Sequence, residues 1–309
     1  MTSFGIDCWS DVWRSGTISE RPLWHYTSLR SLSLILSKRT LRFSRLDQFS
    51  DDTEEGLPTT ETLQERRKFY LSGRTAAPLD DALDKVLEQS KETDERLRAA
   101  AAVTCWNSEP TESAYMWTKY GKNGACISSS IGRLIRALPS QKDPQKPIYI
   151  REVKYLAEDF GPIDEDEQIA LAYVKRNRWQ VETELRAIAV QYTAPPLVFG
   201  PQPVNGLYIS IDTTELARCI LVAPGTESRI RHSVERLVRS CGLTCEVRPS
   251  AFDGARLGGL RVPPAQFMPL YQPTMFGPMG RFGPNEKLLG PAKFNYVNPW
   301  IPPLPKRGR

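Results

Sequence analysis

Hydrophobic and polar residues follow two periods through residue 247, one typical of strands and one typical of helices. Short apolar or alternating runs predict strands at 23–27, 40–44, 101–106, 125–128, 148–155, 207–211, 218–222 and 244–247. Apolar residues spaced by three and four predict helices at 28–37, around 79–87, and at 112–120, 165–175 and 228–240. Strands and helices do not alternate regularly, so the pattern favours an α+β domain over a doubly wound sheet.

The pattern changes at Pro263. Residues 263–309 are rich in proline and glycine and lack periodicity, but they keep aromatic side chains such as Phe267, Tyr271 and Tyr296. So many aromatic residues are unusual in a purely disordered tail. We therefore expect a single α+β domain over residues 1–262 and an extended arm over 263–309 that wraps the domain or docks onto a partner protein.

Composition limits the class of protein but does not indicate a function. The chain has 309 residues, of which 40% are hydrophobic and 25% charged, as in ordinary globular proteins. Its net charge of +5 permits an anionic partner without requiring one. No run approaches the roughly 20 apolar residues that span a bilayer, and residues 1–16 lack the pattern of a signal peptide. We expect a cytoplasmic protein with reduced cysteines and no metal site, because Cys241 and Cys245 form a lone pair.

The stretch 179–186, of sequence WQVETELR, places a large aromatic residue, two acids and an arginine within eight residues. If it is extended, Glu182, Glu184 and Arg186 share one face of a strand, while Thr183 and Leu185 share the other. Such a face is either a ladder of surface charges or the acidic end of a catalytic site. Same-face neighbours lie roughly 6.6 Å apart along a strand, which is compatible with the carboxylate spacing of glycosidic-bond chemistry.

Histidines and aromatic residues offer further candidates. His25 stands between Trp24 and Tyr26 in a short strand and is expected to face away from both. A half-buried structural histidine is the plain interpretation. Trp117 and Tyr120 are three residues apart in a predicted helix, where they form either a packed pair or a wall for a flat ring. His232, the other histidine, is expected on the polar face of its helix.

Several blocks of the sequence, taken in order, resemble the bacterial family called domain of unknown function 2971. The resemblance covers about residues 20–225 and rests on the order and spacing of the blocks, not on any single block. The blocks are residues 23–29, 41–44, 49–52, 54–55, 104–107, 116–121, 124–127, 153–155 and 179–186. The chain departs from the family at Asp51 and Asp52, where a proline commonly follows the first acid, and in its long tail.

That family is in turn similar to the ADP-ribosyltransferase fold, in the branch marked by a His, a Tyr and an acid. The resemblance implies a split, strongly bent mixed β-sheet with peripheral helices, cradling NAD. It assigns His25 to the adenosine-side ribose, Tyr120 or Trp117 to the nicotinamide, and Glu184 or Glu182 to the nicotinamide ribose. The remaining residues implied at the NAD site are Tyr26, Thr27, Arg42, Arg45 and Arg186, with an arginine meeting the pyrophosphate.

In transferases of this kind with two acids one residue apart, the second acid generally holds the NAD ribose and the first orients the acceptor. That analogy suggests Glu184 for catalysis and Glu182 for the acceptor, and the reverse stays open. Arg186 either positions an ionised Glu184 or merely neutralises it.

The resulting hypothesis is an NAD-dependent ADP-ribosyltransferase, or a related NAD-consuming toxin, effector or defence enzyme. It would transfer ADP-ribose to a protein, to nucleic acid or to water. One alternative is a non-catalytic nucleotide-binding or protein-interaction module on the same fold. Another is a metal-dependent nuclease that uses Asp51, Asp52, Glu54 and Glu55 as ligands.

Overall fold

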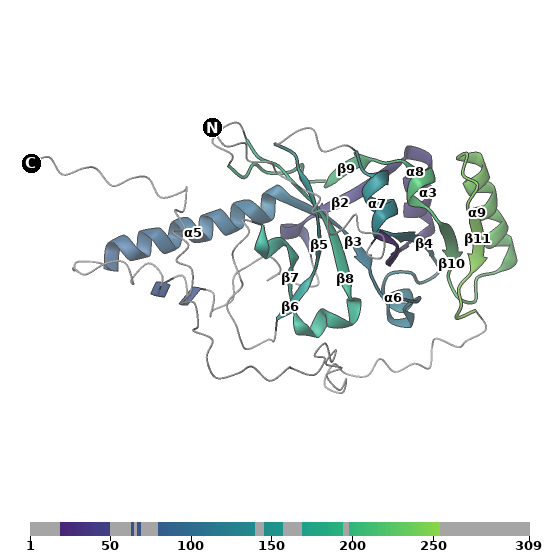
Figure 1. Cartoon of the computed structure of the whole chain (residues 1–309), viewed down its shortest axis with the longest axis horizontal. Coiled ribbons are helices and arrows are strands. Elements are labelled where there is room, and N and C mark those ends of the chain that lie inside the picture. Colours follow the sequence, from purple (N-terminus) through teal and green to yellow (C-terminus); the bar gives the residue numbers. More distant parts are fainter. Residues whose placement is uncertain are drawn as a thin grey trace, which may run out of the picture. The chain divides into compact units, whose positions relative to one another are not determined.

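The computed structural model describes residues 19–49, 63–64, 67–68, 80–139, 145–156, 169–193 and 198–253 (Figure 1). The strands are β1 Pro22–Thr27, β2 Thr40–Arg45, β3 Ala101–Asn107, β4 Ala125–Ser130, β5 Ile148–Glu152, β6 Lys154–Leu156, β7 Val174–Arg176, β8 Glu184–Val190, β9 Leu207–Ser210, β10 Cys219–Val222 and β11 Glu246–Pro249. The α-helices are α3 Leu29–Lys38, α5 Asp80–Ala100, α6 Ala114–Lys119, α7 Ile131–Ala137, α8 Thr213–Leu216 and α9 Ser228–Ser240. The 3-10 helices are η1 Leu46–Gln48, η2 Ala170–Tyr173 and η3 Asn177–Glu182. The expected α+β character is confirmed.

Local sequence explains where these elements begin and end. Helix α3 starts at Ser28, whose hydroxyl accepts a hydrogen bond from the Ser31 amide at 3.1 Å and caps the first turn. Leu32 and Leu36 lie one turn apart on its buried face. The helix ends at Arg39, which adopts a left-handed conformation with φ of 51° and turns the chain into β2.

Two predicted elements are wrong. The helix expected at 165–175 is, in its described part, a 3-10 helix followed by the strand β7. Its apolar run is buried throughout, and periodicity alone does not distinguish such a run from a helix. The strand expected at 148–155 is divided at Val153, whose amide still donates to the Glu184 carbonyl of β8 at 2.9 Å, while the next residues form β6 and pair with β7. The short helices α7 and α8 were not predicted.

Nine strands form one mixed sheet within the described residues, and its pairing is largely antiparallel. Strands β11, β10, β4, β1 and β3 are neighbours in that order, and only the β10–β11 pair of this sheet is parallel. Strand β8 pairs with β3 along residues 101–107, and β5 follows β8. Strands β3, β8 and β5 lie side by side in Figure 1, with α9 beside β11 at the other end of the sheet.

The sheet divides at β3. Strand β8 occupies one edge of β3 along its whole length, so every other partner must use the opposite edge. Strand β2 pairs there near the start of β3, at Ala102 and Val103. Strand β1 pairs only at the last residue, where Trp24 faces Asn107. Because β1 and β2 share one edge without pairing to each other, a gap opens between them.

Apolar side chains cover both faces of the sheet. On one face, Leu23, Ile127 and Ala187 join a large core with α3, α7 and α9. On the other face, Ile188 and its neighbours pack with α5 and η2, and a third cluster forms beneath α6. Because side chains alternate along β8, Glu184 and Arg186 lie on the same face as Ile188. This acidic side chain and this basic side chain are therefore buried beside apolar clusters.

In the part of the chain that the structure describes, no helix is both long and apolar enough to cross a membrane. The arm predicted over 263–309 lies outside the described residues, as does the expected partner contact that it would make.

Candidate functional site

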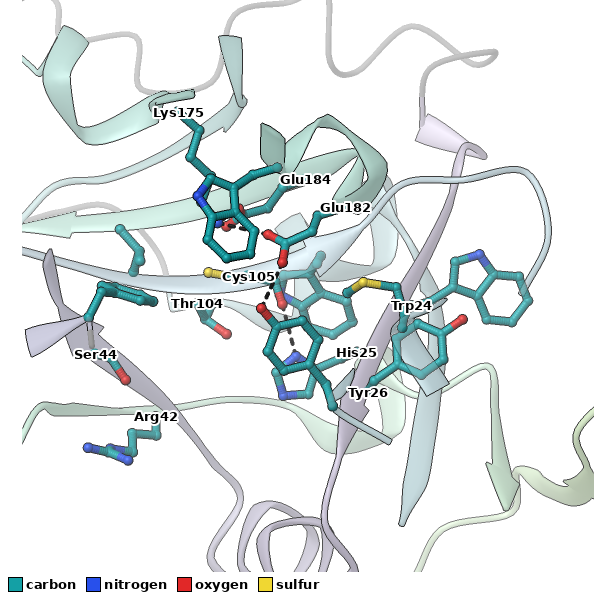
Figure 2. A pocket seen from close by; sticks show the side chains of 16 residues that line it. Trp24, His25, Tyr26, Arg42, Ser44, Thr104, Cys105, Lys175, Glu182 and Glu184 are labelled. Carbon is teal, nitrogen blue, oxygen red and sulfur yellow. Dashed lines mark hydrogen bonds and ion pairs between the residues drawn. The ribbon is translucent and has the colours of Figure 1, made fainter. Parts of the chain in front are cut away.

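A cavity of about 240 Å³ lies at the gap between β1 and β2 (Figure 2). Its walls come from β1, β2 and β3 on one side and from the η3 region and β8 on the other. The lining residues are Trp24, His25, Tyr26, Arg42, Ser44, Phe49, Val103, Thr104, Cys105, Trp106, Met116, Tyr120, Lys175, Trp179, Glu182 and Glu184. Figure 2 shows Glu182 and Glu184 on one side of the cavity, across from His25 and Arg42.

His25 occupies the gap itself. Its Nδ1 lies 3.1 Å from the carbonyl oxygen of Cys105, and because a carbonyl only accepts, Nδ1 carries the proton and donates. The ring packs against Trp106 with the ring centres 4.9 Å apart and the planes tilted by 37°, away from its neighbours on β1 as predicted. Burial lowers the pKa of His25, so the ring is neutral near pH 7 and Nε2 is an acceptor. A neutral imidazole of this tautomer can accept a hydrogen bond from a hydroxyl group of a ligand.

Glu182 is buried, with 3% of its surface exposed, and its carboxylate meets three donors. Oε1 accepts from the Tyr120 hydroxyl at 2.8 Å and from Lys119 Nζ at 2.9 Å. Oε2 accepts from Lys175 Nζ at 2.8 Å. Tyr120 is 40% exposed and Lys119 is partly exposed, so two of the three donors reach solvent.

The predicted strand conformation is wrong at Glu182. Glu182 is the last residue of η3, and Thr183 then adopts a left-handed conformation with φ of 39° before β8 begins. This conformation is strained for a β-branched residue, by about 1–3 kcal/mol. Ser108 holds the turn, because its amide and hydroxyl donate to the Thr183 carbonyl at 2.8 and 2.9 Å. The two glutamates still converge, through a kink instead of through strand alternation.

Glu184 is held more rigidly. Arg186, with no exposed surface, donates from Nε to Oε1 at 2.7 Å and from the NH2 group to Oε2 at 3.2 Å. Lys175 Nζ adds a third contact to Oε2 at 3.1 Å. Burial alone raises the pKa of the Glu184 carboxyl, but the charges of Arg186 and Lys175 outweigh burial and lower the pKa to about 2. Glu184 is therefore fully ionised at neutral pH.

The sequence-based prediction missed one cationic and one aromatic residue that line the cavity beside the two glutamates. Lys175 lies on β7 and joins both carboxylates. Trp179 lines the cavity from η3, and Lys119 Nζ sits 3.9 Å above its ring centre in a cation–π contact. The signal for Lys175 was present in the sequence, since it is a single lysine at the end of the apolar run 169–174. A buried lysine there needs a nearby carboxylate.

Other residues expected at an NAD site divide into two groups. Arg42 and Tyr26 line the cavity, and the Tyr26 hydroxyl accepts from the Ser113 amide at 2.8 Å. Four others do not line it: Trp117, Thr27, Arg45 and Arg186.

Trp117 is a core residue, 1% exposed, packed edge-on against Tyr26 at 5.0 Å. It does not share a wall with Tyr120, because α6 ends at Lys119 and Tyr120 is already the capping residue. Arg45 instead turns to Asp47 and to the Gln202 carbonyl. Arg186 lies beneath Glu184 and reaches the Ala172 carbonyl at 2.8 Å.

No group of three or more His, Cys, Asp or Glu side chains is arranged to hold a metal ion among the described residues. The four acids of the nuclease hypothesis, Asp51, Asp52, Glu54 and Glu55, lie outside those residues, so that hypothesis stays a prediction. His232 is exposed on α9, as expected.

Comparison with known proteins adds nothing to this geometry. No protein-family model matches the chain, and neither the curated proteins nor the solved structures gave a match.

The charges of the site suit an anionic ligand. Lys119, Lys175 and Arg186 place three positive charges against the two carboxylates, and Arg42 adds a further cation across the cavity. Aromatic rings and a neutral histidine face the same space. Such a cavity offers flat apolar surface for a ring, acceptors for hydroxyl groups and positive charge for phosphates.

Proposed function

We propose that the chain is an NAD-dependent ADP-ribosyltransferase, or a related NAD-consuming enzyme, that works in the cavity between β1 and β2. The observation that carries the proposal is the convergence of His25, Tyr120, Glu182 and Glu184 on one cavity. These residues come from separate segments of the chain, and the resemblance to the transferase fold assigned them together to NAD. The division of the sheet at β3 is a second observation that supports the proposal, because the resemblance implies a split sheet.

The size of the cavity sets how NAD would lie. About 240 Å³ is just below the roughly 300–1,000 Å³ of pockets for drug-sized ligands. The cavity therefore takes one ring and its ribose, and the remainder of the dinucleotide would extend toward Arg42 and His25, with the adenosine-side ribose at His25. In this arrangement the nicotinamide lies between Tyr120 and Trp179, and Arg42 meets the pyrophosphate.

The reaction breaks the bond between the nicotinamide nitrogen and C1′ of the ribose. The bonding electrons leave with nicotinamide, positive charge develops on the ribose, and the acceptor attacks C1′ and loses its proton. A carboxylate already aimed at the ribose stabilises that charge most strongly at the transition state.

Between the two acids, the contacts favour Glu182 as the catalytic residue, the reverse of the assignment suggested by analogy. Glu184 is fixed by Arg186, which is itself fully buried. Glu182 is bound by the exposed Tyr120, whose hydroxyl occupies the place that a ribose hydroxyl would take. A ligand can displace this hydroxyl far more easily than it can displace a buried arginine.

The test is release of nicotinamide from NAD by the full chain, alone and with protein, RNA or DNA acceptors. Glu182→Gln should lower the rate by roughly 10²-fold or more while NAD binding persists. Glu92→Gln, at an exposed ion pair with Arg96, is the control and should retain the wild-type rate. Failure of the wild type to bind or consume NAD with any acceptor would overturn the proposal.

A non-catalytic nucleotide-binding module is the second candidate. The saturation of both carboxylates by cations favours it, because neutralised acids stabilise a developing positive charge less well. Binding of NAD without release of nicotinamide, equal in the wild type and Glu182→Gln, would support this candidate.

A further inference from the structure

Lys175 forms an ion pair with each of the two glutamates. Its side chain is 8% exposed, and its Nζ lies 2.8 Å from Glu182 Oε2 and 3.1 Å from Glu184 Oε2. It comes from β7, a strand of the small sheet formed with β6, not from β8, which begins at Glu184. A lysine carries three donors and no acceptor, so one ammonium group can bridge two carboxylates.

The two glutamates depend on this bridge unequally. Glu184 keeps the paired contact of Arg186 if the lysine is removed. Glu182 would keep Lys119 and Tyr120, which both contact Oε1 and are more exposed than Lys175. Its other oxygen, Oε2, would lose the ammonium group that lies 2.8 Å away.

Several other charged or titratable groups among the described residues approach the two acids. Lys119 and Tyr120 approach from α6, Cys105 from β3, and Arg186 from β8. Tyr155 approaches from β6, where its hydroxyl accepts from the Glu184 amide at 2.8 Å. Lys175 joins Glu182 to the fixed Glu184–Arg186 pair.

We propose that Lys175 is a positioning residue that fixes Glu182 against the Glu184–Arg186 pair and so holds its other oxygen, Oε1, toward the cavity. The inference rests on the proposed role of Glu182. In this arrangement Glu184 does not act on the substrate. It serves as the anchor through which Lys175 orients the reacting acid, which explains why a glutamate in the site is locked by a buried arginine.

The test compares Lys175→Met and Lys175→Arg with the control Lys154→Met, an exposed lysine on the neighbouring strand β6. Lys175→Met should lower kcat for nicotinamide release by roughly 10²-fold, as expected for a misplaced catalytic group. The KM for NAD should change by less than about threefold, because the lost group orients an acid instead of binding NAD. Lys175→Arg should recover most of kcat, since arginine keeps the charge and the donors. Equal kcat in Lys175→Met and the wild type, or a loss confined to KM, would overturn the inference.

A second readout does not need activity. In a crystal structure of Lys175→Met, the Glu182 carboxylate should leave hydrogen-bonding distance of the Tyr120 hydroxyl, while Glu184 remains paired with Arg186. An unmoved Glu182 would refute the inference even if the wild type never consumes NAD. The Lys175→Met chain still has two buried carboxylates facing two cations, Lys119 and Arg186, so its charges balance. If it does not fold, Lys175→Gln, which supplies two neutral donors, takes its place in both measurements.

Discussion

Acid should destabilise this protein through one identified carboxyl group, that of Glu184. Its pKa in the folded chain is about 2, against an ordinary value of 4.5, because the charges of Arg186 and Lys175 outweigh the opposing effect of burial. At about 1.36 kcal/mol for each pKa unit, the difference corresponds to about 3 kcal/mol. Since whole domains are stable by only about 5–15 kcal/mol, this is a large share.

The sign follows from the direction of the change. The folded state holds its proton less tightly than the unfolded state, so the contribution is fully present above pH 4.5. It declines as the pH falls below 4.5 and is lost near pH 2. Between pH 4.5 and pH 3 the loss should be about 2 kcal/mol.

Urea unfolding of the wild type and of Glu184→Gln, from pH 7 to pH 3, measures this contribution. At pH 7 the variant should be less stable by about 3–5 kcal/mol, because Arg186 and Lys175 lose a buried partner. The gap between the two proteins should narrow by about 2 kcal/mol from pH 5 to pH 3. Glu92→Gln, in an exposed pair, should differ from the wild type by less than about 0.5 kcal/mol throughout. A gap that stays constant with pH would refute the reasoning.

Three further predictions concern other parts of the fold. Gly124→Ala should lower the melting temperature by several degrees, since its Cβ would lie 2.1 Å from the Thr27 carbonyl oxygen; an unchanged melting curve would contradict this. Iodoacetamide should label Cys105 only after unfolding, because burial and the Glu184 charge raise its pKa; mass spectrometry showing prompt labelling of the native chain would count against it. NMR of His25 at pH 6.5 should show fewer than half of the rings protonated, because burial lowers the pKa; a mostly charged ring would disagree.

Many strands and helices could be predicted from the sequence because they depend on residues that are close together in the chain. The runs that form β1, β2 and β3 are short and buried, and the Ser28 cap marks the start of α3. The apolar run 169–174 failed as a helix prediction because it is buried along its whole length, so it carries no period to interpret.

Parts of the site could not be predicted for a related reason. The turn at Thr183 depends on hydrogen bonds from Ser108, which is 75 residues away in the sequence. The bridge by Lys175 depends on β7 pairing with β6, a contact between two short segments. Trp117 and Tyr120 do not share a helical face because α6 ends between them, at Lys119. The exact end of a helix is hard to predict from periodicity. The convergence of His25 with the acids rests on the division of the sheet at β3.

The most direct test of the account is a structure of the full chain with an NAD analogue in which a methylene group replaces the ring oxygen of the nicotinamide ribose. That change prevents cleavage and leaves the hydroxyl groups in place. We predict the nicotinamide ring between Tyr120 and Trp179, a ribose hydroxyl on Glu182 in place of the Tyr120 hydroxyl, and His25 Nε2 on the other ribose. An analogue bound away from this cavity, or one that does not bind at all, would contradict the account.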